Sequence, residues 1–211
     1  MKSYEHVIWD WNGTLLDDVA LCVKVVNRLK AERGQPPLSV ERYRAIFRFP
    51  VESYYADAGF DFSKETFKDV GKEWVDGYEK EKYGCGLRRG VLEVLGKLAS
   101  SGTGQSVLSA YSQRPLEEGV AHYGLSKYFT RLRGLDTIYA PGKVALGKEL
   151  IRDLGCGAGK ALLIGDTEHD LEAAEAMGAD CVLVAGGHQS RERLAGTGAV
   201  VLGGIEELLT L

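Results

Sequence analysis

The feature that most constrains the fold is an alternation of short apolar runs with amphipathic helical segments. The apolar runs cover residues 6–9, 106–108, 161–164, 181–184 and 200–202. Most of the intervals between the later runs carry apolar residues at helical spacing. Strands that alternate with helices favour a parallel sheet with helices on both faces. We therefore predict an α/β fold with a doubly wound, Rossmann-like parallel sheet.

A long helical stretch interrupts this alternation after the first run. Residues 17–87 contain four segments with helical character, the last of which would begin at Ser63 as its N-cap, and no convincing strand. An insertion of this kind indicates a second unit placed within the first. We predict a core domain formed by residues 1–16 and 88–211, and an inserted all-α cap domain formed by residues 17–87.

Polar side chains follow three of the apolar runs. Asp10 follows the first run, Ser109 follows the second, and Asp166 follows the third, with Asp170 one helical turn later. Open parallel sheets bind ligands outside the carboxyl ends of their strands, so these side chains would meet in one crevice if the strands are neighbours. Gathered carboxylates repel one another unless they hold a hard cation, and oxygen ligands suit Mg²⁺.

Four short motifs in this order resemble those of the haloacid-dehalogenase-like (HAD) superfamily, in its phosphoglycolate-phosphatase-like branch. They are D-W-N-G-T at 10–14, the Ser109 that ends a strand, Lys143 in A-P-G-K, and G-D-T-E-H-D at 165–170. The insertion falls where members of the family carry a helical cap. The resemblance implies a magnesium-dependent phosphatase that acts on a small phosphorylated metabolite.

The resemblance also implies a role for each motif residue. Asp10 would be the nucleophile that forms an aspartyl-phosphate, and Ser109 and Lys143 would hold the phosphoryl oxygens. The metal would be bound by Asp10, the backbone carbonyl of Asn12 and Asp166, with Asp170 orienting the metal shell more than binding directly. Loop amides from Asn12 to Thr14, Gly13 included, would add hydrogen-bond donors for the substrate.

Lys148 competes with Lys143 for the role of the family lysine. The apolar face of its helix is formed by Leu146, Leu150 and Leu154, and Lys148 points away from that face toward solvent. Lys143 stands in the loop where the helix starts, which is the place of the lysine in the family. We therefore favour Lys143.

Position 12 departs from the family pattern, because phosphatases of the family usually have Asp there as the general acid and base. An amide cannot give or take a proton in this role. Three interpretations follow: the substrate has a good leaving group, another residue such as His169 or a cap residue supplies the proton, or the protein binds or senses a phosphorylated ligand. A metal-independent haloacid dehalogenase is a further alternative, although it leaves Asp166 and Asp170 without a purpose.

Three further residues are weighed against plainer interpretations. Arg48 is a candidate specificity residue of the cap, with a surface arginine that covers nearby aromatic rings as the equal alternative. His169 is expected to be a solvated residue at a helix start. His188 follows an apolar run in G-G-H, which would open near the same sheet edge; it is a candidate for the rim of the site, and a plain loop is the favoured alternative.

Composition excludes several other classes of protein. The net charge is −4 and no Lys/Arg stripe outweighs its acidic neighbours, so we expect no nucleic-acid partner. The N-terminal residues lack an apolar run long enough for a signal peptide or a membrane span. The four cysteines are widely spread, without a C-x-x-C pair, which favours free thiols in a reducing cytoplasm. The sequence does not predict the oligomeric state.

Overall fold

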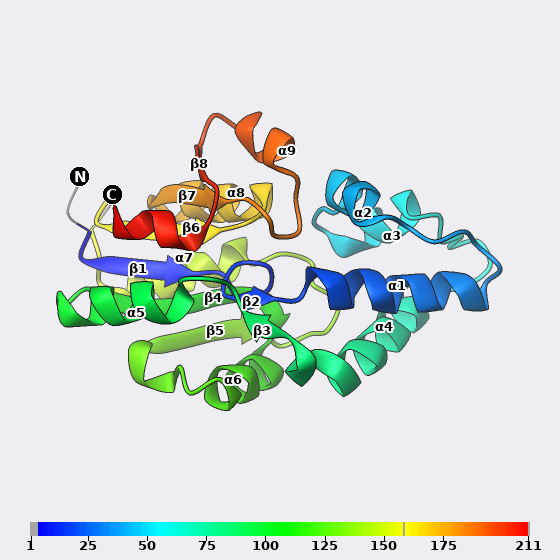
Figure 1. The fold of residues 1–211 in the computed structure, drawn as a ribbon, viewed down its shortest axis with the longest axis horizontal. Helices are drawn as coiled ribbons and strands as arrows, with labels where there is room; N and C mark the ends of the chain where they lie inside the picture. The colour runs from blue at the N-terminus through cyan, green and yellow to red at the C-terminus, as the bar shows by residue number, and fades with distance from the viewer. Residues whose placement is uncertain (1–3, 158, 211) are drawn as a thin grey trace.

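A computed structural model of the protein describes residues 4–157 and 159–210. Within these residues the central sheet has six parallel strands in the order β5-β4-β1-β6-β7-β8 (Figure 1). The strands are β1 (His6–Trp9), β4 (Gly104–Ser112), β5 (Arg131–Leu135), β6 (Ala161–Gly165), β7 (Asp180–Val184) and β8 (Val200–Leu202). The predicted α/β parallel sheet is therefore confirmed. Residues 1–3, 158 and 211 of the predicted core domain lie outside the described residues.

Helices cover both faces of the sheet because successive side chains of a strand point to opposite faces. On one face, Val7 and Trp9 of β1 pack with α5 (Val91–Ser100), α6 (Gln113–His122) and the 3₁₀ helix at Ile205–Leu209. On the other face, Ile8 packs with α7 (Val144–Leu154) and α8 (Glu168–Met177). The central position of β1, with a buried layer on each side, fixes the carboxyl end of this strand firmly in the molecule.

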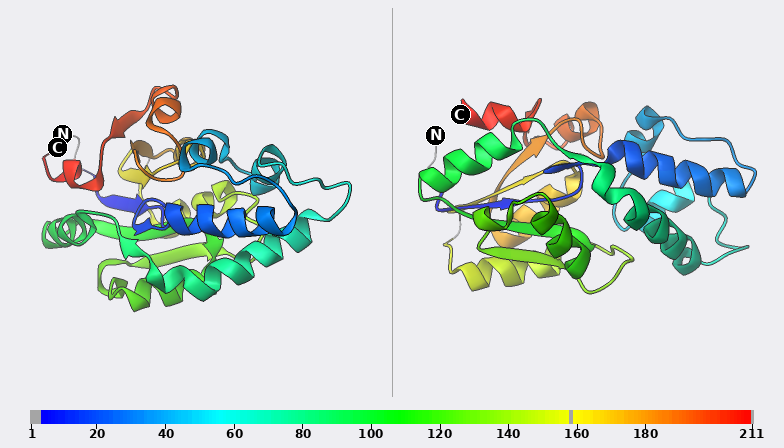
Figure 2. Two further views of the ribbon diagram at one scale, coloured as in Figure 1. Left: turned by 45° about the vertical axis from the view of Figure 1, so that its right-hand side comes forward. Right: turned by 60° about the horizontal axis from the view of Figure 1, so that its bottom comes forward.

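The insertion forms a helical body beyond the carboxyl ends of the strands (Figures 1 and 2). Its helices are α1 (Val19–Glu32), α2 (Val40–Ile46), α3 (Val51–Asp57) and α4 (Phe67–Glu81). These helices enclose a hydrophobic cluster of their own, which includes Val25, Val26 and Tyr43 and is separate from the two clusters on the sheet. The cluster supports the predicted division into core and cap, and the domain boundaries themselves stay a prediction.

The ends of the insertion are paired with each other. Leu16–Asp17 (β2) and Gly86–Leu87 (β3) form a short antiparallel pair. The expectation that residues 17–87 contain no strand was wrong at these two ends. Two-residue strands have too few side chains to produce a period-two pattern, and only the meeting of distant segments creates them.

Sequence reasoning also misplaced one helix start and missed two elements. Helix α4 begins after Thr66, whose hydroxyl accepts from the backbone N–H of Asp69, and Ser63 instead lies in a turn that Asp61 stabilises. The prediction of Ser63 as N-cap was therefore wrong. Strand β5 (Arg131–Leu135) and helix α9 (Arg191–Ala195) were not predicted. Alternating arginines in β5 concealed a strand at the sheet edge, where polar side chains reach solvent.

No helix in the described part of the chain is long and apolar enough to cross a membrane. The four cysteines are all free thiols: Cys22 is buried, and Cys85, Cys156 and Cys181 are partly exposed. The expectation of free thiols is confirmed.

Candidate functional site

Three neighbouring strands bring the predicted polar residues together. Strand β1 is hydrogen-bonded to β4 on one side and to β6 on the other, so Asp10 and Asp166, which directly follow β1 and β6, lie at the same edge of the sheet. The prediction that Ser109 ends a strand was wrong, because β4 continues to Ser112 after an irregularity in its pairing with β5, but Ser109 lines the same cavity as Asp10. The backbone N–H of Asp10 donates to the carbonyl of Ile164 at 2.9 Å, which extends the β1–β6 pairing by one residue. All three side chains are buried. The sequence predicted that these side chains would meet if their strands are neighbours. The strands are neighbours, and the side chains meet.

Lys143 reaches into this cluster from the start of α7. Its ammonium group contacts Oδ1 of Asp10, lies 2.6 Å from Oδ1 of Asp170, and donates to the carbonyl of Leu108 at 2.9 Å. The side chain is 2% exposed, whereas Lys148 is exposed on the same helix. Burial would lower the pKa of Lys143, but Asp10 and Asp170 raise it above its ordinary value. Lys143 is therefore a charged group held against Asp10.

His169 fixes the backbone of Lys143. The backbone N–H of Lys143 donates to Nε2 of His169 at 2.8 Å, and Nδ1 of the same ring lies 2.8 Å from Glu172. The ring is 7% exposed, so the expectation of a solvated histidine was wrong. Because Nε2 accepts from an amide, it carries no proton in this arrangement. His169 thus acts on the position of Lys143, and the imidazole nitrogens are both occupied.

Asp166 and Asp170 have different surroundings. Asp166 accepts from the hydroxyl of Thr14 at 2.7 Å and from the backbone N–H of His188 at 2.6 Å. Oδ2 of Asp170 accepts from the backbone N–H groups of Asp166 and Thr167 and from the Thr167 hydroxyl, which caps the start of α8. Among the described residues, its Oδ1 has no donor aligned for a hydrogen bond and makes only the ion pair with Lys143. Asp170 therefore connects the helix start to the lysine.

The carboxylates of this edge form a group suited to a divalent cation. One oxygen from each of Asp10, Asp166 and Asp170 lies within 4.8 Å of the others, and all three residues are buried. Burial and the two neighbouring carboxylates raise the pKa of Asp10, against the lowering effect of Lys143. Three carboxylates against one ammonium leave an excess of negative charge in a dry place, which a hard cation would neutralise. The residues present therefore fit Mg²⁺.

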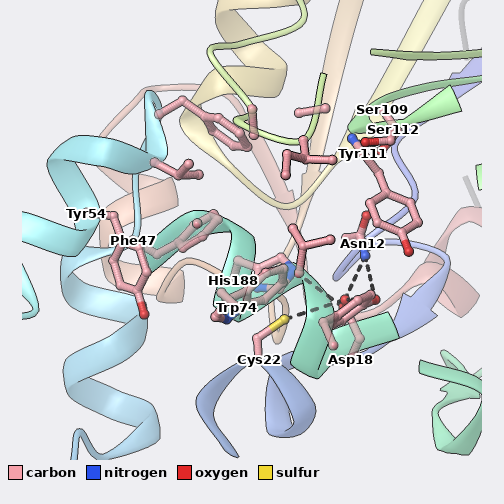
Figure 3. Close-up of a pocket in the computed structure, with 18 of the residues that line it drawn as sticks. Asn12, Asp18, Cys22, Phe47, Tyr54, Trp74, Ser109, Tyr111, Ser112 and His188 are labelled. Atoms are coloured by element: carbon pink, nitrogen blue, oxygen red, sulfur yellow. Dashed lines mark hydrogen bonds and ion pairs between the residues drawn. The ribbon is translucent and has the colours of Figure 1, made fainter. Parts of the chain in front are cut away.

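Asn12 is held by two residues of the cap. Its amide nitrogen donates to Oδ2 of Asp18 at 2.7 Å and to the hydroxyl of Tyr78 at 2.9 Å, and that hydroxyl lies 2.7 Å from the same carboxylate (Figure 3). The backbone N–H of Gly13 donates to Oδ1 of Asp18 at 2.9 Å. The donors of Asn12 and Gly13 are thus directed at Asp18, and the Thr14 hydroxyl is directed at Asp166.

His188 completes this buried network from the other end of the chain. Its Nε2 lies 3.4 Å from Oδ1 of Asp18, and its Nδ1 lies 2.8 Å from the hydroxyl of Tyr43. Burial would lower the pKa of His188, but Asp18 raises it to about 9. In return, His188 lowers the pKa of Asp18 against the effect of burial. The expectation of a plain loop residue at 188 was wrong, because the residue is a buried cation at the boundary of core and cap.

A cavity of about 230 Å³ opens beside these groups, between the sheet edge and the cap. The core residues Asp10, Asn12, Ser109 and Lys143 form its floor, and cap residues such as Phe47, Tyr54 and Trp74 also line it. In Figure 3, Phe47 and Tyr54 lie on the side away from Asn12 and Ser109. Arg48 does not line it. Its guanidinium lies 2.7 Å from Asp57 and is 48% exposed, so the structure does not bring this predicted specificity residue to the cavity.

Sequence reasoning missed the buried partners of Asn12. Asp18, Tyr78 and His188 are separated by up to 170 positions and share no motif, so no spacing in the sequence connects them. One signal was available, since two acidic residues, Asp17 and Asp18, stand together where the insertion begins. A charged pair beside apolar periodic residues indicates that one of the two faces a polar partner.

Comparison with known proteins agrees with this geometry. The profile of the haloacid dehalogenase-like hydrolase family matches residues 7–184, and the chain belongs to this family. A phosphoglycolate phosphatase from Rhodobacter capsulatus is 27% identical over 191 residues, which is 87% of this chain and 85% of that protein. A hydrolase of the family from Streptococcus pneumoniae superposes with a TM-score of 0.85 at 19% identity, covering 100% of this chain and 99% of the other. CbbY from Rhodobacter sphaeroides, solved in complex with phosphate, gives a TM-score of 0.76 at 20% identity, covering 97% and 96%.

Proposed function

We propose that this chain is a phosphatase that hydrolyses a small phosphomonoester through an aspartyl-phosphate on Asp10. The observation that carries the proposal is the contact between Asp10 and the charged Lys143 on the floor of a cavity, with Ser109 on the same floor. The matched relative named a phosphoglycolate phosphatase agrees with this class of reaction. A nucleophile, a cation and a hydroxyl at one sheet edge are the groups that phosphoryl transfer needs.

Asp10 would attack the phosphorus atom with one carboxylate oxygen while the bond from phosphorus to the ester oxygen breaks. Lys143 and Ser109 would hold the phosphoryl oxygens and balance the charge that spreads over them in the transition state. Water would then attack the phosphorus of the aspartyl-phosphate while the bond from phosphorus to the Asp10 oxygen breaks, which releases inorganic phosphate and restores the carboxylate. The proton that the water gives up balances the one that the departed ester oxygen takes up from solvent. Because Lys143 is anchored by Asp170 and by His169, its ammonium group needs little rearrangement during these steps.

Mg²⁺ would be held by Asp10, Asp166 and the backbone carbonyl of Asn12. It would supply positive charge for the phosphoryl group in a site where the three carboxylates otherwise dominate. Thr14 and the backbone of His188 orient Asp166 for this role, since both donate to its oxygens. Asp170, whose Oδ2 caps α8 and whose Oδ1 pairs with Lys143, would act on the position of these ligands.

The experiment is a Mg²⁺-dependent assay against a panel of phosphomonoesters, with Asp10→Asn as the matched variant. We expect turnover that needs Mg²⁺ and is lost in Asp10→Asn, while circular dichroism shows an unchanged fold. Beryllium fluoride should form an adduct on Asp10. Ligand binding without turnover would instead indicate a sensing protein, and metal-independent halide release would indicate a dehalogenase. Near-native activity of Asp10→Asn would contradict the mechanism.

A further inference from the structure

The cavity above Asp10 is built mainly from aromatic rings. Nine of its described lining residues are Phe, Tyr or Trp, and most of them come from the cap. Phe47 and Phe49 belong to the segment after α2, and Trp74 stacks on Tyr78 with ring centroids 4.9 Å apart. Rings of this kind stabilise a bound apolar or aromatic group by burial and by ring–ring contacts.

The polar atoms of several of these rings are already used within the protein. The hydroxyl of Tyr43 pairs with His188, that of Tyr78 donates to Asp18, and that of Tyr111 contacts Glu79. A ligand in the cavity would therefore meet the carbon faces of these rings. The hydroxyl of Tyr54 is the exception, since it is buried without a hydrogen-bond partner among the described residues. A leaving group rich in hydroxyl groups, such as a sugar, would therefore replace few of its hydrogen bonds to water.

The charges around the cavity do not suit an anionic leaving group. Among the described lining residues the cations are Lys143, which is held by Asp10 and Asp170, and His188, which is held by Asp18. The third acidic group in the lining, Glu79, lies 2.7 Å from Lys82. A carboxylate on the leaving group would thus find no unpaired cation there, and it would lie among acidic side chains.

The size of the cavity sets a limit on the occupant. Its volume is about 230 Å³, while an apolar protein cavity of ~150 Å³ is enough to bind benzene. A phosphoryl group with one aromatic ring fits this volume. Ile138, which is 38% exposed, lies at the rim of the cavity.

The amide at position 12 favours the same kind of ligand for an independent reason. Asn12 cannot donate a proton to the leaving oxygen, and its N–H groups point to Asp18 and Tyr78. A phenolic oxygen, whose conjugate acid has a pKa of about 10 in tyrosine, departs without this help far more readily than the oxygen of an alkyl alcohol.

We propose that the substrate is a phosphomonoester whose leaving group is an uncharged aromatic ring, attached through a phenolic oxygen. The ring would lie against Phe47, Phe49 and Trp74 while the phosphoryl group meets Asp10 and Lys143. This inference rests on the proposed phosphatase function and narrows its substrate class. It sets this chain apart from a phosphatase for phosphoglycolate, in which a carboxylate must be recognised.

Three substrates separate recognition of the ring from the quality of the leaving group. In benzyl phosphate and in phosphoglycolate, the leaving oxygen is attached to a saturated carbon. Only phosphoglycolate carries a carboxylate. Phenyl phosphate carries the ring on a phenolic oxygen. We expect kcat/KM to be at least tenfold higher for benzyl phosphate than for phosphoglycolate, and higher again for phenyl phosphate. Equal or higher kcat/KM for phosphoglycolate would overturn the proposal.

Two variants test the cavity itself. Trp74→Ala should lower the ratio of kcat/KM for benzyl phosphate to kcat/KM for phosphoglycolate about tenfold. The matched control is Phe62→Ala, which removes a partly buried cap ring that does not line the cavity. If Trp74→Ala does not fold, Ile138→Lys at the exposed rim provides the test. The added cation should raise kcat/KM for phosphoglycolate relative to kcat/KM for benzyl phosphate. No change in this ratio in either variant would contradict the assignment.

Binding of phosphonates distinguishes failure of this inference from failure of the proposed function. Benzylphosphonate and phosphonoacetate cannot be hydrolysed, so calorimetry in the presence of Mg²⁺ measures recognition alone. We expect benzylphosphonate to bind at least tenfold more tightly. If it does so but no phosphomonoester is turned over, the cavity assignment stands and the phosphatase function fails. If turnover occurs but phosphonoacetate binds more tightly, the function stands and the substrate class is wrong.

Discussion

Nδ2 of Asn12 donates a 2.7 Å hydrogen bond to Oδ2 of the fully buried Asp18. The side chain at position 12 and the start of the cap are therefore chemically matched: an amide faces a carboxylate. An aspartate at position 12 would put two carboxylates in contact in a buried place, where like charges are costly. The amide at position 12, where the family usually has Asp, is thus accompanied by a buried carboxylate at position 18.

The first prediction follows from this pair. Asn12→Asp alone should give little gain in phosphatase activity and should lower thermal stability, because Asp18 repels the new carboxylate. The double variant Asn12→Asp/Asp18→Asn restores an amide–carboxylate pair with the carboxyl group at position 12. It should raise kcat on alkyl phosphates at least tenfold, within the general acid–base range. The gain should be smaller on aryl phosphates. Asp18→Asn alone is the control, and equal activity of all three variants would contradict the prediction.

The second prediction concerns His169, which the sequence offered as a proton source. Since Nε2 of His169 accepts from the backbone of Lys143, its loss should displace the lysine. His169→Ala should lower kcat about tenfold, and by a similar factor on phenyl phosphate and on alkyl phosphates. A proton donor would be needed mainly for the poor leaving groups. A loss confined to alkyl phosphates would therefore show that His169 is the general acid after all.

The third prediction concerns the metal. Asp166→Ala should weaken Mg²⁺ binding more than Asp170→Ala, because Oδ2 of Asp170 caps α8 and its Oδ1 pairs with Lys143. Isothermal titration of both variants with Mg²⁺ gives the comparison. Asp170→Ala should instead lower the thermal stability, since it leaves the backbone N–H groups of Asp166 and Thr167, just before α8, without this acceptor. Equal weakening of Mg²⁺ binding in the two variants would place Asp170 among the direct ligands.

The fourth prediction concerns pH. His6 is buried in β1 with Nε2 2.9 Å from the hydroxyl of Ser106, and burial lowers its pKa. The folded protein therefore binds a proton at His6 less readily than the unfolded chain does. The contribution of neutral His6 to the free energy of unfolding is therefore fully present above the ordinary histidine pKa of 6.5. The free energy of unfolding falls as the pH drops below this value. Urea unfolding from pH 7.5 to 5 should show a shallower fall in His6→Gln than in the native chain. Parallel curves would show that His6 does not contribute.

Local patterns in the sequence were enough for five of the six described strands of the central sheet and for the catalytic edge. The alternation of apolar runs with helical segments predicted the parallel strands, and polar residues directly after three of the runs predicted Asp10, Ser109 and Asp166 at one edge. These inferences succeeded because they need only the period of the strands and the rule that parallel strands end on the same side. Lys143 was implied by the resemblance to the HAD family, and its place in the loop before an amphipathic helix favoured it over Lys148.

The surroundings of Asn12 and the character of the cavity were decided by the tertiary structure alone. The two ends of the cap supply Asp18 and Tyr78, and the loop after β7 supplies His188. These residues meet because the pairing of β2 with β3 brings the two ends of the insertion together. The sequence determined which side chains are available, since strand ends and helix faces are local properties. Which of them touch is a long-range property, set by how two separate hydrophobic cores are packed across the cavity, and no local period encodes it.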